Sequence, residues 1–280
     1  MTRVAWITDP HLNFAVDQYR RFLFESLEFA EADAVLVSGD IAESRELEGE
    51  LIELFTVIGK PLYFVLGNHD YYRGSIREVR DQMRGFIAKT PGLVYLSQAG
   101  VIELAPGVGL VGHDGWGDGR LGDFFDSDVQ LNDYALIAEL AETRVGWEND
   151  KVELAKRLAR LGDEAAAHLA AVLPDALDRD GYRNVVVVTH VPPFREACWY
   201  EGGLSDDNWA PHFTCGAVGD VLRAVMQARQ EQRMLVLCGH THGEGIAQIL
   251  PNLRVLTGGA KYCRPVVNQV FNFPAWFAEW

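Results

Sequence analysis

Five short motifs in the 280-residue chain carry side chains of the types that bind metal ions or transfer protons. They are Asp9-Pro10-His11, Gly39-Asp40, Gly67-Asn68-His69-Asp70, His190 and Gly239-His240-Thr241-His242. Together they supply carboxylate, imidazole and amide groups but no thiolate. Such a mixed set suits Mn, Fe, Co, Ni or Zn in a reactive centre better than it suits a structural zinc site. If the motifs meet in space, we expect them to form a metal centre.

Each motif also has a purely structural interpretation. Asp-x-His can form a turn and Gly-Asp is a common helix entry, because turns and N-caps favour these residue types. A single histidine such as His190 is commonly held by a hydrogen bond, whereas His240 and His242 would share one face of an extended chain. Independent turns, however, do not require five of the eight histidines to fall in these motifs. The collection therefore favours one shared site.

The residues before the motifs have the pattern of buried β-strands. Strand-like apolar runs are 4–8, 34–38, 62–66, 109–112, 185–189, 234–238, 246–250, 255–257 and 266–271. Helical periodicity covers 17–32, 45–58, 76–87, 128–144, 150–173 and 218–230. The alternation predicts an α/β fold with a largely buried sheet. Because ligands in such folds bind beyond the carboxyl ends of the strands, all five motifs are expected at one crevice.

The chain is expected to form one domain over residues 1–280, because it contains no internal repeat and no low-complexity linker. Regular alternation is interrupted between Gly115 and Arg183, where the glycine-rich loop "GWGDGRLGD" leads into two consecutive helical patterns. We predict a helical insertion or cap at 115–183. Residues 191–216 form a long segment rich in aromatic and turn residues, which we predict to be a loop framing the site.

Composition limits the partners and the location of the protein. The formal charge is −15, with 40 acidic against 25 basic residues. Such a chain repels a phosphate backbone, so long nucleic acid is not expected to bind. No apolar run reaches about 18 residues and the N-terminus lacks the pattern of a signal peptide, so we expect a cytoplasmic protein without a membrane partner. The four cysteines lack CxxC spacing and are expected to be free thiols. The sequence does not indicate an oligomeric state.

In their order and spacing, the motifs resemble those of the calcineurin-like metallophosphoesterase superfamily. The resemblance spans residues 9–242. It implies a four-layer α/β/β/α sandwich of two mixed sheets flanked by helices, with two divalent transition-metal ions at one edge. The implied ligands are Asp9, His11 and His242 for the first ion and Asn68, His190 and His240 for the second, with Asp40 bridging the two.

The resemblance also implies a reaction. Two ions held about 3.5–4 Å apart can share a hydroxide and clamp phosphate oxygens for in-line displacement. We therefore expect metal-bound hydroxide to hydrolyse a small phosphorylated substrate, either a mono- or a diester. His69 is implied to be the acid that protonates the leaving oxygen, since an imidazole pKa of about 6.5 lies near working pH. Asp70, also predicted to belong to the catalytic site, would either orient an imidazole or cap the following helix.

Departures from better-known relatives narrow the class of enzyme. Purple acid phosphatases carry an iron-binding tyrosine three residues after the Gly-Asp aspartate, where this chain has Glu43. Protein Ser/Thr phosphatases carry Gly-Asp-x-Val-Asp-Arg-Gly, where this chain reads "GDIAESR". Both activities are therefore disfavoured. Two alternatives stay open, a nuclease, which would need a basic track, and a non-catalytic metal-binding scaffold of the same fold.

Substrate contacts are predicted in the segments around the crevice. Trp199, Trp209 and His212 are candidates because aromatic rings can stack on a flat group, although the tryptophans could equally anchor their loop. Arg73 is a candidate phosphate contact, and His113, after the strand-like "GLVG", is a candidate pocket residue. The glycines that precede ligands are expected to let the chain approach the metals closely, since they lack a Cβ. They are Gly39, Gly67 and Gly239.

Overall fold

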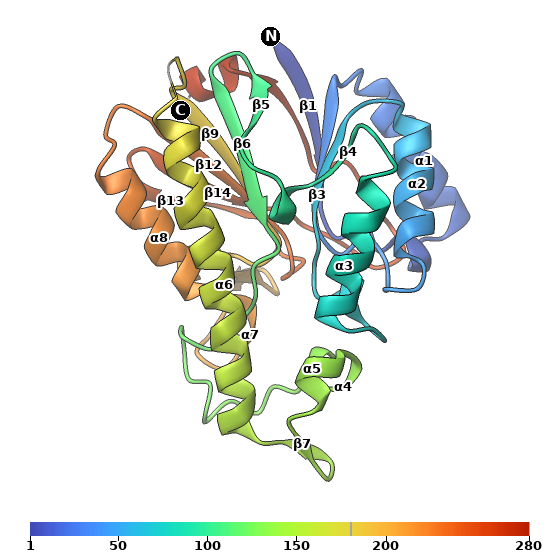
Figure 1. Ribbon diagram of the computed structural model, residues 1–280, viewed down its shortest axis with the longest axis vertical. Coiled ribbons are helices and arrows are strands. Elements are labelled where there is room, and N and C mark those ends of the chain that lie inside the picture. The colour runs from blue at the N-terminus through green and yellow to red at the C-terminus, as the bar shows by residue number, and fades with distance from the viewer. Residues whose placement is uncertain (180, 280) are drawn as a thin grey trace.

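The computed structural model describes residues 1–179 and 181–279; Asp180 and Trp280, which fall within the predicted domain bounds, lie outside the described residues. Two mixed β-sheets form the centre of the molecule, and helices cover the outer face of each (Figure 1). The structure thus confirms the predicted α/β fold of two mixed sheets flanked by helices.

The first sheet has the strand order β15-β1-β2-β3-β4. Its strands are β1 (Thr2–Ile7), β2 (Ala34–Ser38), β3 (Leu62–Val65), β4 (Leu93–Tyr95) and β15 (Gln269–Phe273). β1 to β4 run parallel, and β15 pairs antiparallel with β1. The helices between successive parallel strands are α1 (Asp17–Phe29), α2 (Leu47–Ile58) and α3 (Ile76–Ile87). They lie together on one side of the molecule (Figure 1).

The second sheet has the strand order β13-β14-β12-β9-β6-β5. Its strands are β5 (Ile102–Ala105), β6 (Val108–His113), β9 (Asn184–Thr189), β12 (Arg233–Cys238), β13 (Gly245–Leu250) and β14 (Leu253–Thr257). The four inner strands are parallel and both edge strands are antiparallel. Helices α6 (Lys151–Leu177) and α8 (Gly216–Gln227) cover its outer face (Figure 1).

Side chains of each strand alternate between two apolar layers. In β1, Val4 and Trp6 belong to a buried cluster that includes Val186 and Leu235 from the second sheet, so this cluster lies between the sheets. Ile7 instead packs in the cluster formed with α1, α2 and α3. Because successive residues of a strand point to opposite faces, near-continuous apolar strands are what a sheet buried on both faces requires.

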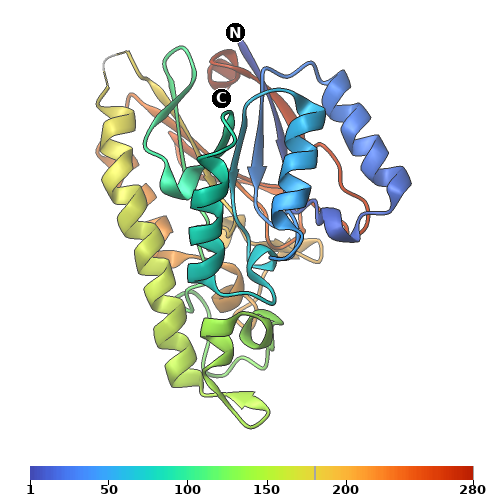
Figure 2. The same ribbon diagram turned by 45° about the vertical axis from the view of Figure 1, so that its right-hand side comes forward.

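Residues 115–150 form a lobe at one end of the molecule, at the bottom of Figure 1. The lobe contains α4 (Asp133–Leu136), α5 (Ala138–Ala141), β7 (Arg144–Val145) and β8 (Glu148–Asn149). Helix α6 continues from the lobe along the second sheet (Figure 2). Its first half packs Leu154 and Leu158 with residues of the lobe, whereas Leu169 and Leu173 pack on the second sheet. The later half of the predicted insertion is therefore part of the helical layer of the fold.

The prediction of a single helix over 128–144 is wrong, because the structure has the two short helices α4 and α5 there. Ile137, between them, is extended. The backbone on either side bonds to a neighbouring loop: Arg73 N donates to Leu136 O and Ala138 N donates to Gly74 O. These tertiary hydrogen bonds replace helical ones at the break. The sequence prediction also missed the short strands β4 and β5.

The segment 191–216 contains little regular structure, although it is well packed. It includes β10 (Trp199–Tyr200), β11 (Gly203–Leu204) and α7 (Ala210–Phe213). Short 3₁₀ helices lie at Leu12–Phe14, His69–Tyr71, Leu96–Gln98, Arg195–Ala197 and Ala275–Glu279. The four cysteines are free thiols. Within residues 1–179 and 181–279, no helix is long and apolar enough to span a membrane.

Candidate metal centre

The loops that follow five parallel strands converge at one edge of the two sheets. The strands are β1, β2 and β3 of the first sheet and β9 and β12 of the second, and each ends just before one of the five motifs. Asp9, His11, Asp40 and His190 are each about 1% exposed. The structure thus brings the predicted metal-ligand side chains together in two adjoining groups.

The first ligand group consists of Asp9, His11, Asp40 and His242, whose potential ligand atoms all lie within 4.8 Å of one another. His11 Nε2 is 3.2 Å from His242 Nε2 and 3.7 Å from Asp40 Oδ2. His242 Nε2 is 3.6 Å from Asp9 Oδ1. Four ligand atoms at these spacings can surround one cation.

The second ligand group consists of Asp40, Asn68, His190 and His240. Asn68 Oδ1 is 3.1 Å from His190 Nε2 and 2.9 Å from His240 Nδ1. Asp40 Oδ1 is 3.4 Å from His190 Nε2. The two oxygens of Asp40 therefore face different groups, Oδ2 toward the first and Oδ1 toward the second.

Hydrogen bonds around the second group show which of its atoms carry protons. His190 Nδ1 donates to Ser38 O at 2.8 Å and His240 Nε2 donates to His212 O at 3.3 Å. Since a carbonyl oxygen only accepts, the other nitrogen of each neutral ring has a lone pair. Both lone pairs face Asn68 Oδ1, which is itself an acceptor because the Asn68 amide nitrogen donates to Asp133 at 2.8 Å. When both rings are neutral, these converging acceptors fit a bound cation, and in the absence of a cation a proton can take its place.

Burial and mutual charge explain the pKa values of these groups. Burial lowers the pKa of His11 to about 3 and the pKa of His240 to about 3. Burial opposes a charged Asp40, but His190 and His69 hold the pKa of Asp40 well below its usual range. Burial also opposes a charged His190, yet Asp40 raises the pKa of His190 to about 10. In the metal-free protein a proton on His190 thus compensates the buried Asp40 carboxylate, a role that a cation can take over.

The ligand loops adopt unusual backbone conformations. Asp9, His11, Asp40, His240 and His242 all have positive φ, between 40° and 71°. Non-glycine residues rarely adopt this region, and such conformations cluster at functional sites. A Cβ on Gly67 would lie 2.2 Å from Asp40 Oδ1, and one on Gly39 would lie 2.5 Å from His190 Nδ1. The close approach expected of these glycines is therefore present.

His69 lies beside the first ligand group rather than inside either group. Its ring stacks on Tyr72 at 4.2 Å between centroids and meets the His11 ring edge-on at 4.6 Å. His69 Nε2 is 3.3 Å from the hydroxyl of Tyr262. The backbone N–H of His69 donates to Asp40 Oδ1 at 2.9 Å. This position leaves the imidazole next to the pocket over the metal centre.

Asp70 has neither of the two roles expected for it. Its carboxylate accepts from the backbone N–H groups of Gly67, Ile41 and Ala42 at 2.7–2.9 Å. It is fully buried and meets no imidazole nitrogen at hydrogen-bond distance, and α3 is capped by Ser75. Asp70 therefore joins the loop after β2 to the loop after β3, a positioning role.

Two aspartates with positioning contacts were missed by the sequence prediction. Asp133 accepts from the Asn68 amide and from the Tyr72 hydroxyl, at 2.8 and 2.7 Å. Asp114 accepts from Leu66 N at 2.8 Å and from the hydroxyl of Tyr71 at 2.7 Å. The sequence did contain a signal for the role of Asp114, since this residue directly follows a strand as the ligand motifs do. It contained no such signal for Asp133, which lies in a segment with a helical pattern.

A pocket of about 300 Å³ opens over the metal centre. Aromatic side chains form much of its wall; they are Tyr72, Tyr200, Phe213 and Tyr262. His69 and His242 also line it, as do Gln130, Leu131 and Asn132 from the lobe. The lobe and the 191–216 segment therefore both contribute side chains to the wall of this pocket.

The five predicted substrate contacts are not among the described residues that line this pocket. Arg73 forms an ion pair with Glu43. The His113 ring packs against His168 of α6 at 5.1 Å. Trp199 covers Gly245, and Trp209 stacks on Phe213 at 5.1 Å.

His212 is buried and bonded to the lobe. Its Nδ1 lies 2.5 Å from the Tyr134 hydroxyl, and its Nε2 lies 2.9 Å from Ser127 Oγ. Its backbone carbonyl, however, accepts from His240. The contacts of Trp199 and Trp209 fit the alternative interpretation, in which the two tryptophans anchor their loop. The contacts of the His113 and His212 side chains are likewise with neighbouring parts of the fold.

Comparison with known proteins assigns the class. The profile of the family described as calcineurin-like phosphoesterase matches residues 2–244, and the chain belongs to this family. The predicted resemblance and the enzyme class, a metallophosphoesterase that hydrolyses phosphate esters, are thereby confirmed. No protein in a search of curated sequences matches the chain.

Two solved structures share the fold. The phosphopantetheinyl hydrolase from Mycobacterium tuberculosis has a TM-score of 0.62 and 16% identity, over 93% of this chain and 90% of that one. A dimetal phosphatase from Danio rerio has a TM-score of 0.51 and 13% identity, over 92% of this chain and 87% of that one. At such identities the likeness establishes a common architecture and nothing finer.

Proposed function

We propose that the protein is a dinuclear-metal phosphoesterase that hydrolyses a small phosphate mono- or diester. The observation that carries this proposal is the position of Asp40, whose two carboxylate oxygens face different ligand groups. Asp9, His11 and His242 would complete one metal site, and Asn68, His190 and His240 the other. The donor set suits Mn, Fe, Co, Ni or Zn. When bound, two such ions supply activation of water and neutralisation of charge on the phosphate.

His69 is proposed to deliver the proton to the leaving oxygen. Its Nδ1 is buried with no hydrogen-bond partner among the described residues, whereas Nε2 faces the Tyr262 hydroxyl at 3.3 Å. As the acid, the ring would be the imidazolium, which carries a proton on both nitrogens, and its Nε2–H would face the Tyr262 hydroxyl oxygen, which can accept it. Transfer of this proton would leave a neutral ring. Stacking on Tyr72 fixes the plane of the ring. A leaving oxygen that replaces the tyrosine as acceptor would receive this proton.

The dimensions of the pocket support a small substrate. A volume of about 300 Å³ is at the lower end of ligand sites, and its aromatic walls restrict what can reach the metals. The chain carries a charge of −15, which disfavours the nuclease alternative. All seven proposed ligand positions carry side chains that can bind a metal ion, and position 69 carries a histidine that can transfer a proton. This disfavours the scaffold alternative.

The proposal is tested by turnover of p-nitrophenyl phosphate and bis-p-nitrophenyl phosphate on protein stripped of metal and reloaded with Mn²⁺. We expect hydrolysis that requires the metal, and the ratio of the two rates gives the preference for mono- or diesters. His168→Ala, a helical histidine away from the pocket, serves as the matched control for His69→Ala. A reloaded protein with two metals per chain and no hydrolysis of either ester, or of a panel of phosphorylated metabolites, would support the scaffold instead.

A further inference from the structure

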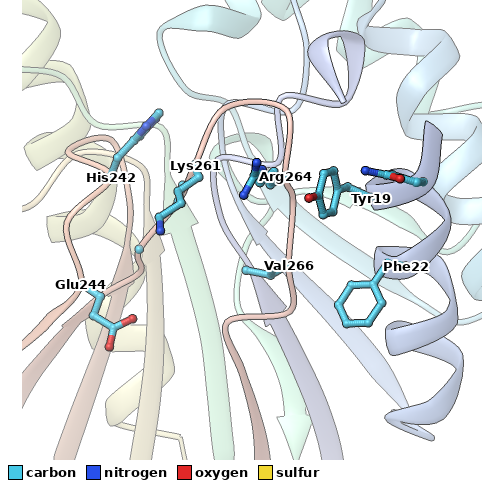
Figure 3. Close-up of a pocket in the computed structure, with 10 residues that line it drawn as sticks. Tyr19, Phe22, His242, Glu244, Lys261, Arg264 and Val266 are labelled. Atoms are coloured by element: carbon cyan, nitrogen blue, oxygen red, sulfur yellow. The ribbon is translucent and has the colours of Figure 1, made fainter. Parts of the chain in front are cut away.

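A second, larger cavity of about 840 Å³ adjoins the metal centre (Figure 3). Its walls come from Tyr19 and Phe22 of α1, from Glu244 and from residues 259–266, the loop between β14 and β15. His242, a proposed ligand of the first group, lines both this outer pocket and the pocket over the metals. The two cavities therefore meet at His242.

The loop of residues 259–266 separates the two cavities and contributes to both. Tyr262 lines the metal pocket, where its hydroxyl lies 3.3 Å from His69 Nε2. Lys261 and Arg264, on either side of Tyr262, line the outer pocket instead (Figure 3). Because His242 lines both cavities, a substrate whose phosphate lies at the metal site would reach the outer pocket by extending past this residue.

The charges in the outer pocket differ from those of the protein as a whole. The chain has 15 more acidic than basic residues, yet two exposed cations line this cavity. In the described part of the chain, neither Lys261 nor Arg264 forms an ion pair with a carboxylate, and Glu244 is the one acidic residue in the lining. Their charges are thus available to an anion.

The remaining walls suit an apolar or aromatic body. Phe22 is 56% exposed and Val266 is 43% exposed, although both side chains are apolar. The Arg264 guanidinium lies over the Tyr19 ring, with Cζ 5.1 Å from the ring centroid. This arrangement orients the N–H donors of the guanidinium and leaves the edge of the guanidinium free to bind an anion. Exposed apolar side chains next to unpaired cations are typical of sites for amphipathic anions.

We infer that the outer pocket is the subsite for the organic part of the substrate, an apolar or aromatic group that carries a second anion, such as a second phosphate or a carboxylate. The inference rests on the proposed function, because it places the scissile phosphate at the metal centre. The apolar body lies against Phe22 and Val266, and the second anion pairs with Lys261 and Arg264.

The test uses binding, which does not depend on turnover. Isothermal titration calorimetry of the Mn²⁺-loaded protein compares benzylphosphonate with p-xylylenediphosphonate, which differs by a second phosphonate at the far end of the ring. We expect the second phosphonate to tighten binding about 5- to 30-fold, the range for one anion held by two partly exposed cations. This advantage should disappear in the double variant Lys261→Met/Arg264→Met and should shrink at high salt.

Two controls make the result specific. Lys60→Met, which removes an exposed lysine outside both pockets, should keep the full advantage of the second phosphonate. The double variant should change hydrolysis of p-nitrophenyl phosphate less than it changes binding of the diphosphonate, since the nitro group carries no net charge with which Lys261 and Arg264 could pair.

Equal affinity of wild-type protein for the two phosphonates would overturn the subsite, as would an advantage that survives in the double variant or vanishes in Lys60→Met. Absence of turnover with the binding difference intact would instead reject the proposed reaction and leave the anion site standing. Turnover without the binding difference would reject the subsite alone.

Discussion

The two ligand groups of the metal centre differ in how firmly the protein holds their side chains. In the second group, His190 and His240 each donate a ring N–H to a backbone carbonyl, and Asp133 fixes the Asn68 amide. In the first group, His11 Nδ1 is buried with no hydrogen-bond partner among the described residues. The His242 side chain is 22% exposed and lies between two pockets.

The difference indicates a division of roles between the groups. Partners that orient the ligands in advance raise metal affinity, so the second group should bind its ion more tightly. The first group is next to His69, to Tyr262 and to both cavities. A more loosely held ion at the open side, where substrate arrives, is consistent with its place beside the proposed acid.

The largest expected effect separates proton transfer from metal binding. His69→Ala should lower kcat by about 100- to 10,000-fold, because the leaving oxygen would no longer receive a proton from the imidazole. Metal content should stay at the wild-type value, since His69 belongs to neither group. Kinetics and elemental analysis of the same preparation measure both quantities. Loss of metal together with activity would show that His69 supports the first group structurally.

A smaller effect tests the difference between the groups directly. Asp133→Ala should weaken metal binding by the second group about 10- to 100-fold, because Asn68 loses the partner that aims its oxygen at His190 and His240. The other site should be unaffected, as Asp133 touches no residue of the first group.

Titration of metal-free protein with Mn²⁺ measures both affinities. In wild-type protein the titration should resolve a tight and a weaker site, and in Asp133→Ala the tight one should shift. Asp163→Ala, an exposed carboxylate on α6, serves as the control. A uniform loss at both sites, or none, would remove the proposed asymmetry.

The smallest expected effect concerns the tyrosine over the first group. Tyr262→Phe should lower kcat about 3- to 10-fold, the value of one hydrogen bond that orients His69. The KM for p-nitrophenyl phosphate should change little, because the ring remains. Tyr200→Phe, a substitution of another tyrosine that lines the pocket, is the matched control. A Tyr262→Phe enzyme with wild-type kcat would show that stacking on Tyr72 is sufficient to position His69.

The convergence of the ligand motifs could be predicted from the sequence because it depends on a local rule. Each motif follows a strand, and parallel strands of one sheet end at the same edge, so Asp9, Asp40 and Asn68 had to lie close together once the strands of the first sheet were recognised. His190 and His240 follow strands of the second sheet, and their place beside the first three was implied by the family resemblance. The same pattern identified the wrong residue after β6. His113 is still within the strand and points toward α6, whereas Asp114, one residue later, points to the loop after β3.

Asp133 and Tyr262 could not be predicted, because nothing in the neighbouring sequence determines where they lie. Asp133 reaches Asn68 only because the backbone at 136 and 138 bonds to residues 73 and 74 and breaks a helical pattern. Tyr262 lies in an irregular loop, and its place beside His69 depends on how β15 pairs with β1. Such tertiary pairings override local propensity.

Metal analysis combined with electron paramagnetic resonance of the Mn²⁺-loaded protein shows whether Asp40 joins two metal ions. We expect two manganese ions per chain with an exchange-coupled spectrum. In Asp40→Ala the coupled spectrum should be lost together with activity, whereas Asp81→Ala, an exposed aspartate on α3, should retain both. One ion per chain with full activity, or a coupled pair that persists in Asp40→Ala, would show that Asp40 does not bridge two ions.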